Sequence, residues 1–370
     1  NFFGGKGLEN KGDTEFKPAS TTQFEGPLLS TGHMEMGEGA VFEFTAPAGK
    51  YQTMHHTIGG QGLDSKGEVD VGAYAELTFE GPFVMEGDAC LLNVSSGGFV
   101  AFAAPAGKYL DHTISGEGIT AAGQIDVQQG AKLNFEAPFV DVEGDSVFSI
   151  NAGGSAFFKP LSDGGKHTAG KVLNSGELEL LEEMLVDHYE ANGGVTTLSD
   201  GGSLVASGDD PLLFTGATLS GDGGVCKGEV KLVGDAKLAP GNPANEGSFG
   251  KLKIEGDLEM EATAVTETKV LSAKGTGVEV TGKAKIGGTA NVDVKWRPEE
   301  DTEIPLLIAE GGIEGTYTSC NGCGAEDTIT YKETGNRRLD DGSGSGYGSG
   351  AFLTVKGDGG VGPPKEAWFG

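Results

Sequence analysis

The stretch Phe44-Thr-Ala-Pro-Ala-Gly-Lys-Tyr51 decides the fold, because it returns almost unchanged as Phe102-Ala-Ala-Pro-Ala-Gly-Lys-Tyr109. These are two of six places in the first 160 residues where a phenylalanine is followed two or three positions later by a proline. The six begin at Phe24, Phe44, Phe79, Phe102, Phe135 and Phe158. Each predicts a short strand that is entered near glycine and left at proline.

The spacing of these motifs reveals a longer repeat. The prolines from Pro47 onward are separated by 35, 23, 33 and 22 residues, so that long and short steps alternate. Two steps sum to about 56 residues, which we take as the true internal repeat. Other phrases recur at this distance, such as His56-Thr-Ile58 and His112-Thr-Ile114. Repetition on this scale predicts stacked units rather than one closed core.

The apolar residues alternate with polar ones, as in Val69-Asp-Val71, Ile125-Asp-Val127 and Val278-Glu-Val280. This period of two predicts short, half-buried strands. The 66 glycines and 14 prolines supply frequent turns. Short strands without helix-length connections exclude doubly wound α/β folds and leave two all-β solutions, a solenoid and a series of sandwiches. Sandwiches repeat near ~100 residues, so the sequence favours a parallel β-helix.

In this interpretation the step of about 22 residues is one turn of three strands, and the step of about 33 is the same turn with one corner extended. The whole chain then makes about 11 to 15 turns. The six phenylalanines are expected to form one internal ladder at the inter-strand spacing of ~4.8 Å. The prediction for them is core packing and no further role.

The second half carries a set of motifs in a fixed order. They are Leu238-Ala-Pro-Gly-Asn242, Lys251-Leu-Lys-Ile-Glu255, Ile304-Pro-Leu-Leu-Ile-Ala-Glu-Gly-Gly312, Ile329-Thr-Tyr331 and Phe352-Leu-Thr-Val355. This order resembles the C-terminal end of autotransporter passenger domains, over roughly residues 202–356. The chain departs from that pattern at Ala239, where the family has serine, and in a long insertion after Cys320. The resemblance implies a right-handed β-helix and a secreted surface protein.

Five segments are predicted. They are an N-terminal cap or extension (1–20), a β-helix with 56-residue double-turn repeats (21–180), a junction (181–200), an autotransporter-like β-helix (201–356) with a loop insertion at 320–349, and a C-terminal tail (357–370). The composition of Glu177 to Glu190 predicts a strand followed by one or two helical turns at the junction. The chain lacks an initiating methionine and a leader, so we expect a processed form or a fragment.

Charge restricts the partners. The chain has 55 acidic and 26 basic residues and a formal net charge of −29, which disfavours nucleic acid and anionic membranes. No 18-residue apolar run predicts a membrane span. Stacked turns are expected to place three pairs at equivalent outward positions, one above another, namely Glu68 and Asp70, Gln124 and Asp126, and Glu177 and Glu179. Like charges so arranged repel each other, and Ca²⁺ is one way to relieve this repulsion. A solvated acidic face is the simpler interpretation, and no cofactor is predicted.

Four further features are candidate sites. Cys320 and Cys323 lie in the insertion and are predicted to form a local disulfide, which suits an extracellular or cell-surface location. Cys90 and Cys226 are expected to be small core residues. Asn93-Val-Ser95 is a glycosylation sequon. The aromatic pairs at the two ends of the chain are candidates for self-association, and they are Phe2, Phe3, Trp368 and Phe369.

The prediction for function is a non-enzymatic structural protein. An active site occurs once, whereas His56, His112 and His167 recur with the repeat and so predict a structural role. We expect a self-associating subunit of an extracellular fibre, a flagellar or cell-surface hair, or a surface coat. The first alternative is an adhesin that binds glycans or a host surface, and the least favoured is a polysaccharide lyase or hydrolase.

Overall fold

The computed structural model contains strands and turns and no helix among the residues it describes, which are 2–4, 7–47, 53–85, 87, 90–142, 144, 146–162, 165–241, 250–270, 277–334 and 348–356. The chain divides into two compact units, Asn1–Val195 (unit 1) and Thr196–Gly370 (unit 2). The boundary falls inside the predicted junction at 181–200. Both units are built from short strands that pair in parallel with strands one turn away, which confirms the predicted parallel β-solenoid.

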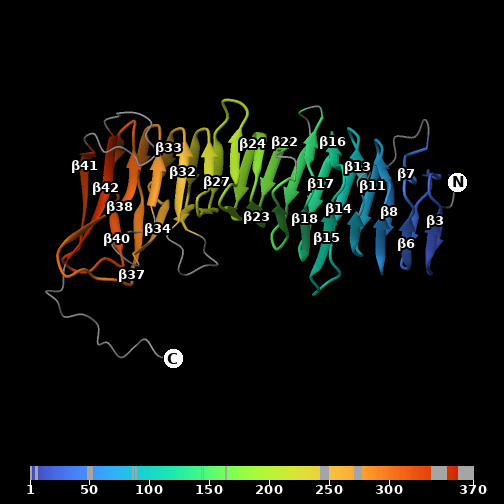
Figure 1. The fold of residues 1–370 in the computed structure, drawn as a ribbon, viewed down its shortest axis with the longest axis horizontal. Helices are drawn as coiled ribbons and strands as arrows, with labels where there is room; N and C mark the ends of the chain where they lie inside the picture. The colour runs from blue at the N-terminus through green and yellow to red at the C-terminus, as the bar shows by residue number, and fades with distance from the viewer. Residues whose placement is uncertain are drawn as a thin grey trace. The chain divides into compact units, whose positions relative to one another are not determined.

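Unit 1 has three parallel sheets, seen in Figure 1 as short arrows from blue to green. Sheet A contains β1 (Phe2–Phe3), β4 (Thr21–Phe24), β7 (Val41–Phe44), β10 (Glu68–Val71), β13 (Leu91–Val94), β16 (Gly118–Ala121) and β19 (Phe139–Asp141). Sheet B contains β2 (Leu8–Asn10), β5 (Leu28–Ser30), β8 (Met54–Ile58), β11 (Ala75–Phe79), β14 (Phe99–Phe102), β17 (Gln124–Val127), β20 (Val147–Ile150), β22 (His167–Asn174) and β24 (Glu183–Asn192). Sheet C contains β3 (Thr14–Phe16), β6 (His33–Met36), β9 (Gly62–Ser65), β12 (Phe83–Met85), β15 (Leu110–Ile114), β18 (Ala131–Phe135), β21 (Ser155–Phe158) and β23 (Glu177–Leu180).

The strands of unit 1 form because alternate side chains enter a common interior. In β10, Val69 and Val71 are fully buried while Glu68 and Asp70 lie at the outer face. The next strands on either side place Phe44 and Val94 in line with Val71. Within residues 1–20, predicted as a cap or extension, the strands β1, β2 and β3 pair with β4, β5 and β6 of the next turn. Each turn therefore buries its apolar face on the turn before it.

The long step of the sequence repeat is not one turn with an extended corner. From Phe79 to Phe102 the chain advances three strands, from β11 to β14, and returns to the same sheet. From Phe44 to Phe79 it advances four strands, from β7 to β11, and so moves to the next sheet. The 56-residue repeat therefore spans seven strands, or two turns and one further strand. Each residue therefore lies on the next sheet relative to its equivalent in the preceding repeat.

This rotation also overturns the prediction of one continuous phenylalanine ladder. The six rings form three stacked pairs, one in each sheet of unit 1. Phe24 stacks on Phe44 in sheet A with 5.0 Å between ring centroids. Phe79 stacks on Phe102 in sheet B at 5.4 Å, and Phe135 stacks on Phe158 in sheet C at 4.2 Å. The role predicted for these residues, core packing, is confirmed because all six are fully buried.

The predicted helical turns after Glu177 are absent, and this segment is β23 followed by the ten-residue strand β24. Helix-forming composition is overridden here by pairing, because His167 to Asn174 of β22 lies in register with Met184 to Ala191 of β24. The first residues of β22 lie against β19 of sheet A, where the amide of Asp141 donates to Thr168 Oγ1 at 3.0 Å. Its last four residues pair with β20 of sheet B. The strand β22 therefore continues from sheet A into sheet B, at a position where the other turns have a corner.

Unit 2 repeats this architecture from yellow-green to orange in Figure 1. Sheet D contains β26 (Ser203–Ala206), β29 (Val225–Lys227), β32 (Lys251–Glu255), β35 (Gly277–Val280) and β38 (Thr302–Ala309). Sheet E contains β27 (Leu212–Thr215), β30 (Val230–Val233), β33 (Leu258–Met260), β36 (Ala284–Ile286) and β39 (Ile313–Gly315). Sheet F contains β28 (Thr218–Gly221), β31 (Lys237–Pro240), β34 (Val265–Val270), β37 (Thr289–Val294) and β40 (Ser319–Asn321). The strand β25 (Val195–Leu198) contains the unit boundary.

Unit 2 ends in antiparallel pairing. The strand β42 (Gly348–Val355) runs antiparallel to β38 on one side and to β41 (Thr328–Thr334) on the other. Part of the predicted loop insertion at 320–349 is therefore the hairpin strand β41. The structure has about 12 turns, within the predicted range of 11 to 15. No helix among the described residues is long and apolar enough to cross a bilayer.

The interior stack makes a testable distinction between two adjacent phenylalanines. Phe158 is fully buried and stacked on Phe135, whereas Phe157 points outward beneath Lys132 Nζ, 4.4 Å from the ring centroid. We expect Phe158→Ala to lower the free energy of unfolding by about 3–5 kcal/mol because it leaves a cavity. Phe157→Ala serves as the control and should cost about 1 kcal/mol or less. Urea denaturation followed by circular dichroism measures both, and equal losses would contradict the assigned register.

Candidate functional site

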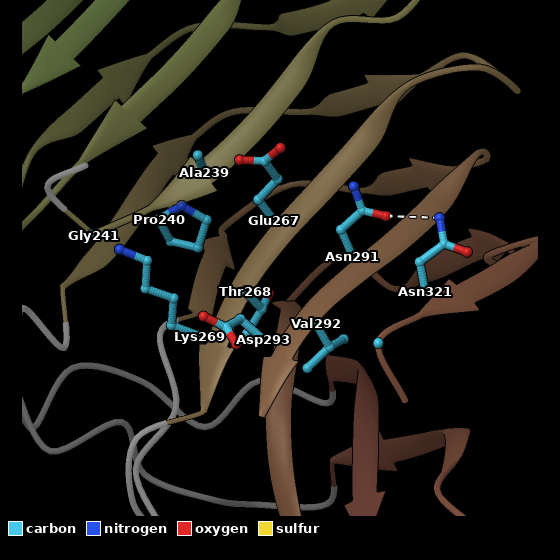
Figure 2. Close-up of a pocket in the computed structure, with 11 residues that line it drawn as sticks. Ala239, Pro240, Gly241, Glu267, Thr268, Lys269, Asn291, Val292, Asp293 and Asn321 are labelled. Atoms are coloured by element: carbon cyan, nitrogen blue, oxygen red, sulfur yellow. Dashed lines mark hydrogen bonds between the residues drawn. The ribbon is translucent and has the colours of Figure 1, made fainter. Parts of the chain in front are cut away.

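The outer face of sheet F carries a groove with a volume of about 600 Å³. It is lined by residues of four neighbouring strands and the turns after them, namely Ala239, Pro240, Gly241, Glu267, Thr268, Lys269, Asn291, Val292, Asp293, Asn321 and Gly322. Figure 2 shows the side chains of Glu267, Asn291 and Asn321 rising from adjacent strands toward the same side. Six of the eleven lining residues have polar side chains, and Ala239, Pro240, Val292 and the carbon atoms of the polar residues add apolar surface to the groove.

Strand register aligns the polar groups in two rows. Glu267 lies beside Asn291, and Asn291 lies beside Asn321, whose Nδ2 donates to Asn291 Oδ1 at 2.9 Å. In the second row Lys269 lies beside Asp293. Neighbours within a row are one strand apart, or ~4.8 Å. The groove therefore presents amide donors and acceptors next to carboxylate acceptors on a rigid sheet.

The two carboxylates of the groove remain accessible to solvent. Glu267 forms an ion pair with Lys237 at 2.9 Å, and 40% of its side chain is exposed. Asp293 pairs with Lys295 at 3.1 Å, and 50% of its side chain is exposed. A catalytic general acid needs a carboxyl group that stays protonated near neutral pH, which enzymes achieve largely by burial. The arrangement suits binding better than acid catalysis.

One edge of the groove belongs to a disulfide-closed loop. Cys320 and Cys323 are joined by a disulfide, and the two residues between them, Asn321 and Gly322, line the groove. Gly322 has φ of +82°, and a Cβ there would lie 2.1 Å from the carbonyl oxygen of Val292. Only glycine fits this close approach. The disulfide thus closes the turn that positions the Asn321 amide.

Asp327 holds this loop against the rest of unit 2. Its side chain is fully buried and accepts a hydrogen bond from each of two Arg297 guanidinium nitrogens, both at 3.2 Å. It also accepts the amides of Gly324 at 2.6 Å and Lys356 at 3.0 Å. Burial acts to raise the pKa of Asp327, but the Lys356 amide, the Arg297 guanidinium and the Gly324 amide together lower it. One carboxylate therefore connects the ends of β37 and β42 to the disulfide loop.

The predicted self-association residues lie outside this groove. Phe2 is 62% exposed, whereas Phe3 stacks on Phe24 with centroids 5.4 Å apart and so belongs to the stack of sheet A. Trp368 and Phe369 lie outside the described residues. Among the cysteines, Cys90 and Cys226 are buried, as expected for core residues, and neither takes part in a disulfide within the described residues.

The glycosylation candidate Asn93 is on β13 at the outer face of sheet A. It is half-buried, and its Nδ2 donates to Asp70 Oδ1 at 3.1 Å. A glycan on Nδ2 would replace one of its two hydrogens and leave one N–H to donate.

The predicted stacking of acidic pairs is wrong. Glu68 and Asp70 lie in sheet A, whereas Glu177 and Glu179 lie in sheet C and Asp126 lies in sheet B. The seven-strand repeat separates them by rotating equivalent residues to different sheets. Among the described residues no group of three or more histidine, cysteine or acidic side chains is placed to hold a metal ion. The alignment of the three named pairs, from which Ca²⁺ binding was suggested, is therefore absent.

Comparison with known proteins does not assign the chain. No protein family model matches it, and no curated protein matches it in sequence. The resemblance of residues 202–356 to autotransporter passenger domains stays a prediction, as does the right-handed sense that it implies.

The contacts of the Asp327 carboxylate are expected to contribute to the stability of unit 2. Asp327→Asn keeps the shape but removes the charge, so we expect the free energy of unfolding to fall by about 2–3 kcal/mol at pH 7. The difference should shrink as the pH falls below 3.8, the ordinary pKa of the group, because a carboxylate with a lowered pKa stabilises only where it is ionised. Asp301→Asn is the control, since Asp301 pairs with the Lys356 side chain at 2.6 Å but is 53% exposed. Urea denaturation of both variants tests this, and equal effects would contradict the proposed anchor.

Proposed function

We propose that this protein is an extracellular surface protein whose unit 2 binds neutral oligosaccharides in the groove of sheet F. The observation that carries the proposal is the double row of polar side chains in strand register. A sugar presents hydroxyl groups that both donate and accept, and the amides of Asn291 and Asn321 do the same. The Glu267 and Asp293 carboxylates accept further hydroxyl groups, and the Lys269 ammonium donates.

Charge favours neutral over acidic sugars as the ligand. Two exposed carboxylates face the groove, and the chain as a whole carries a net charge of −29. Both oppose a polyanion. The disulfide Cys320–Cys323 beside the groove agrees with an oxidising, extracellular location. This is the adhesin alternative among the functions predicted from the sequence.

A glycan array followed by isothermal titration calorimetry tests the proposal. We expect binding to neutral oligosaccharides and little to uronic acid or sulfated ones. Asn291→Ala and Glu267→Gln should each weaken binding about tenfold, which corresponds to ~1.4 kcal/mol. Glu279→Gln is the matched control, because Glu279 pairs with Lys251 at 2.6 Å on sheet D, outside the groove.

Two results would overturn this proposal. Loss of affinity equal in the groove variants and in Glu279→Gln would show that the groove is not the site. Release of shorter sugars from a bound oligosaccharide would show a hydrolase or lyase instead of a binding protein.

Self-association of a structural subunit is the second candidate, and the exposed Phe2 favours it. Burial of a phenylalanine side chain on a second copy contributes about 1.5–3 kcal/mol. We therefore expect Phe2→Ser to reduce oligomers or filaments of the purified protein, while Phe157→Ser leaves them unchanged. Analytical ultracentrifugation and negative-stain electron microscopy measure the size of the assemblies. A parent chain that is monomeric in both would contradict the self-association hypothesis.

A further inference from the structure

Three histidines occupy the interior of unit 1, one in each 56-residue repeat. His56, His112 and His167 are at most 1% exposed. Each lies edge-on against the phenylalanine of the preceding Phe-Pro motif: His56 on Phe44 at 4.9 Å, His112 on Phe102 at 5.1 Å and His167 on Phe158 at 4.7 Å between ring centroids. Since the repeat rotates, they enter the core from three different strands, β8, β15 and β22.

Hydrogen-bond direction shows that two of these rings are held neutral. The backbone amide of Leu28 donates to His56 Nδ1 at 3.3 Å, and that of Phe139 donates to His167 Nδ1 at 3.2 Å. A nitrogen that accepts a hydrogen bond carries no proton, so an imidazolium would lose this bond. It would also place an amide proton against a ring proton and leave a buried cation.

The side chains that face the three rings offer little to stabilise a cation. His56 is in register with Leu77 of β11. The neighbouring His55, on the same strand, acts on it electrostatically and is itself paired with Glu76 at 2.9 Å. His55 disfavours a second positive charge.

The other two rings have similar surroundings. His112 is in register with Leu133 of β18, and the charged groups beside it are Asp111 and its outward register partner Lys132. His167 is in register with Met184 of β24, and the neighbouring Lys166 is paired with Glu183 at 2.5 Å. The carbonyls of Ala103 and Lys159 act weakly in favour of protonating His112 and His167.

Burial is the dominant effect, and it lowers the pKa of all three histidines from 6.5 to about 4. A histidine with a lowered pKa in the folded state takes up its proton mainly on unfolding. Its contribution to stability is therefore complete above pH 6.5 and falls as the pH drops from 6.5 toward 4. The effect of Asp327 in unit 2 begins only below 3.8, outside this window.

The histidines are confined to one unit. All six histidines of the chain precede residue 196, and unit 2 has none. We infer that unit 1 is an acid-triggered switch, in which protonation of His56, His112 and His167 opens its turns while unit 2 stays folded. This inference is independent of the proposed glycan binding.

Hydrogen exchange measured by mass spectrometry on the full chain tests the switch. Rates at pH 7.0 and pH 4.5 are each divided by the unfolded-chain rate at that pH. We expect protection of peptides from β8, β15 and β22 to fall on the order of 10- to 100-fold for each histidine that their opening exposes. Peptides from β32, β34 and β37 in unit 2 should change less than threefold.

Variants separate the switch from general acid denaturation. Asparagine keeps an acceptor near the Nδ1 position but does not titrate, so the triple variant His56→Asn, His112→Asn, His167→Asn should retain unit 1 protection at pH 4.5. The three single variants replace it if the triple variant does not fold, and each should recover part of the protection. His55→Asn is the control, because its side chain is 70% exposed. Unchanged unit 1 protection in the parent chain, or equal loss in parent and buried-histidine variants, would overturn the inference.

Discussion

Parallel pairing in register is the constraint on which the rest of the structure depends. A strand one turn further on lies only ~4.8 Å away, so every inward side chain rests on the inward side chain of the turn before. Unit 1 meets this constraint with aromatic rings that stack at centroid distances of 4.2 to 5.4 Å. The same closeness favours neutral buried histidines, since the side chains in register with them are the apolar Leu77, Leu133 and Met184.

The seven-strand repeat determines what the outside of unit 1 can present. Because equivalent residues move to the next sheet at each repeat, the related pairs Glu68/Asp70 and Gln124/Asp126 lie on sheets A and B. Acidic residues that are not repeat equivalents still meet in register, as Glu15, Glu35 and Asp64 do in sheet C. The sequence repeat therefore does not give identical neighbouring turns on one sheet, which makes its regularity a weaker argument for fibre assembly than the predicted arrangement suggested.

Much of the fold could be predicted from the sequence, because the period of two and the spacing of glycine and proline report strands and corners directly. The number of strands in the long step could not. The strands β9 and β16 each bury one large apolar residue, Leu63 or Ile119, and one small residue, Ser65 or Ala121, so their alternation is weaker than that of neighbouring strands. An extended corner and an added strand then look alike. At β24, helix-forming composition concealed an alternation that appears once Met184 and Val186 are seen to be buried.

The groove of sheet F was beyond sequence reasoning for a different reason. Glu267, Asn291 and Asn321 are 24 to 30 residues apart, and only the strand register brings them into one row. In unit 1 the repeat supplies each sheet with similar residues. In unit 2, where the repeat is lost, neighbouring turns are free to contribute different polar groups to a single face. A binding surface on a solenoid needs this departure from regularity, because a ligand with one shape is recognised by several unlike side chains held at fixed spacing.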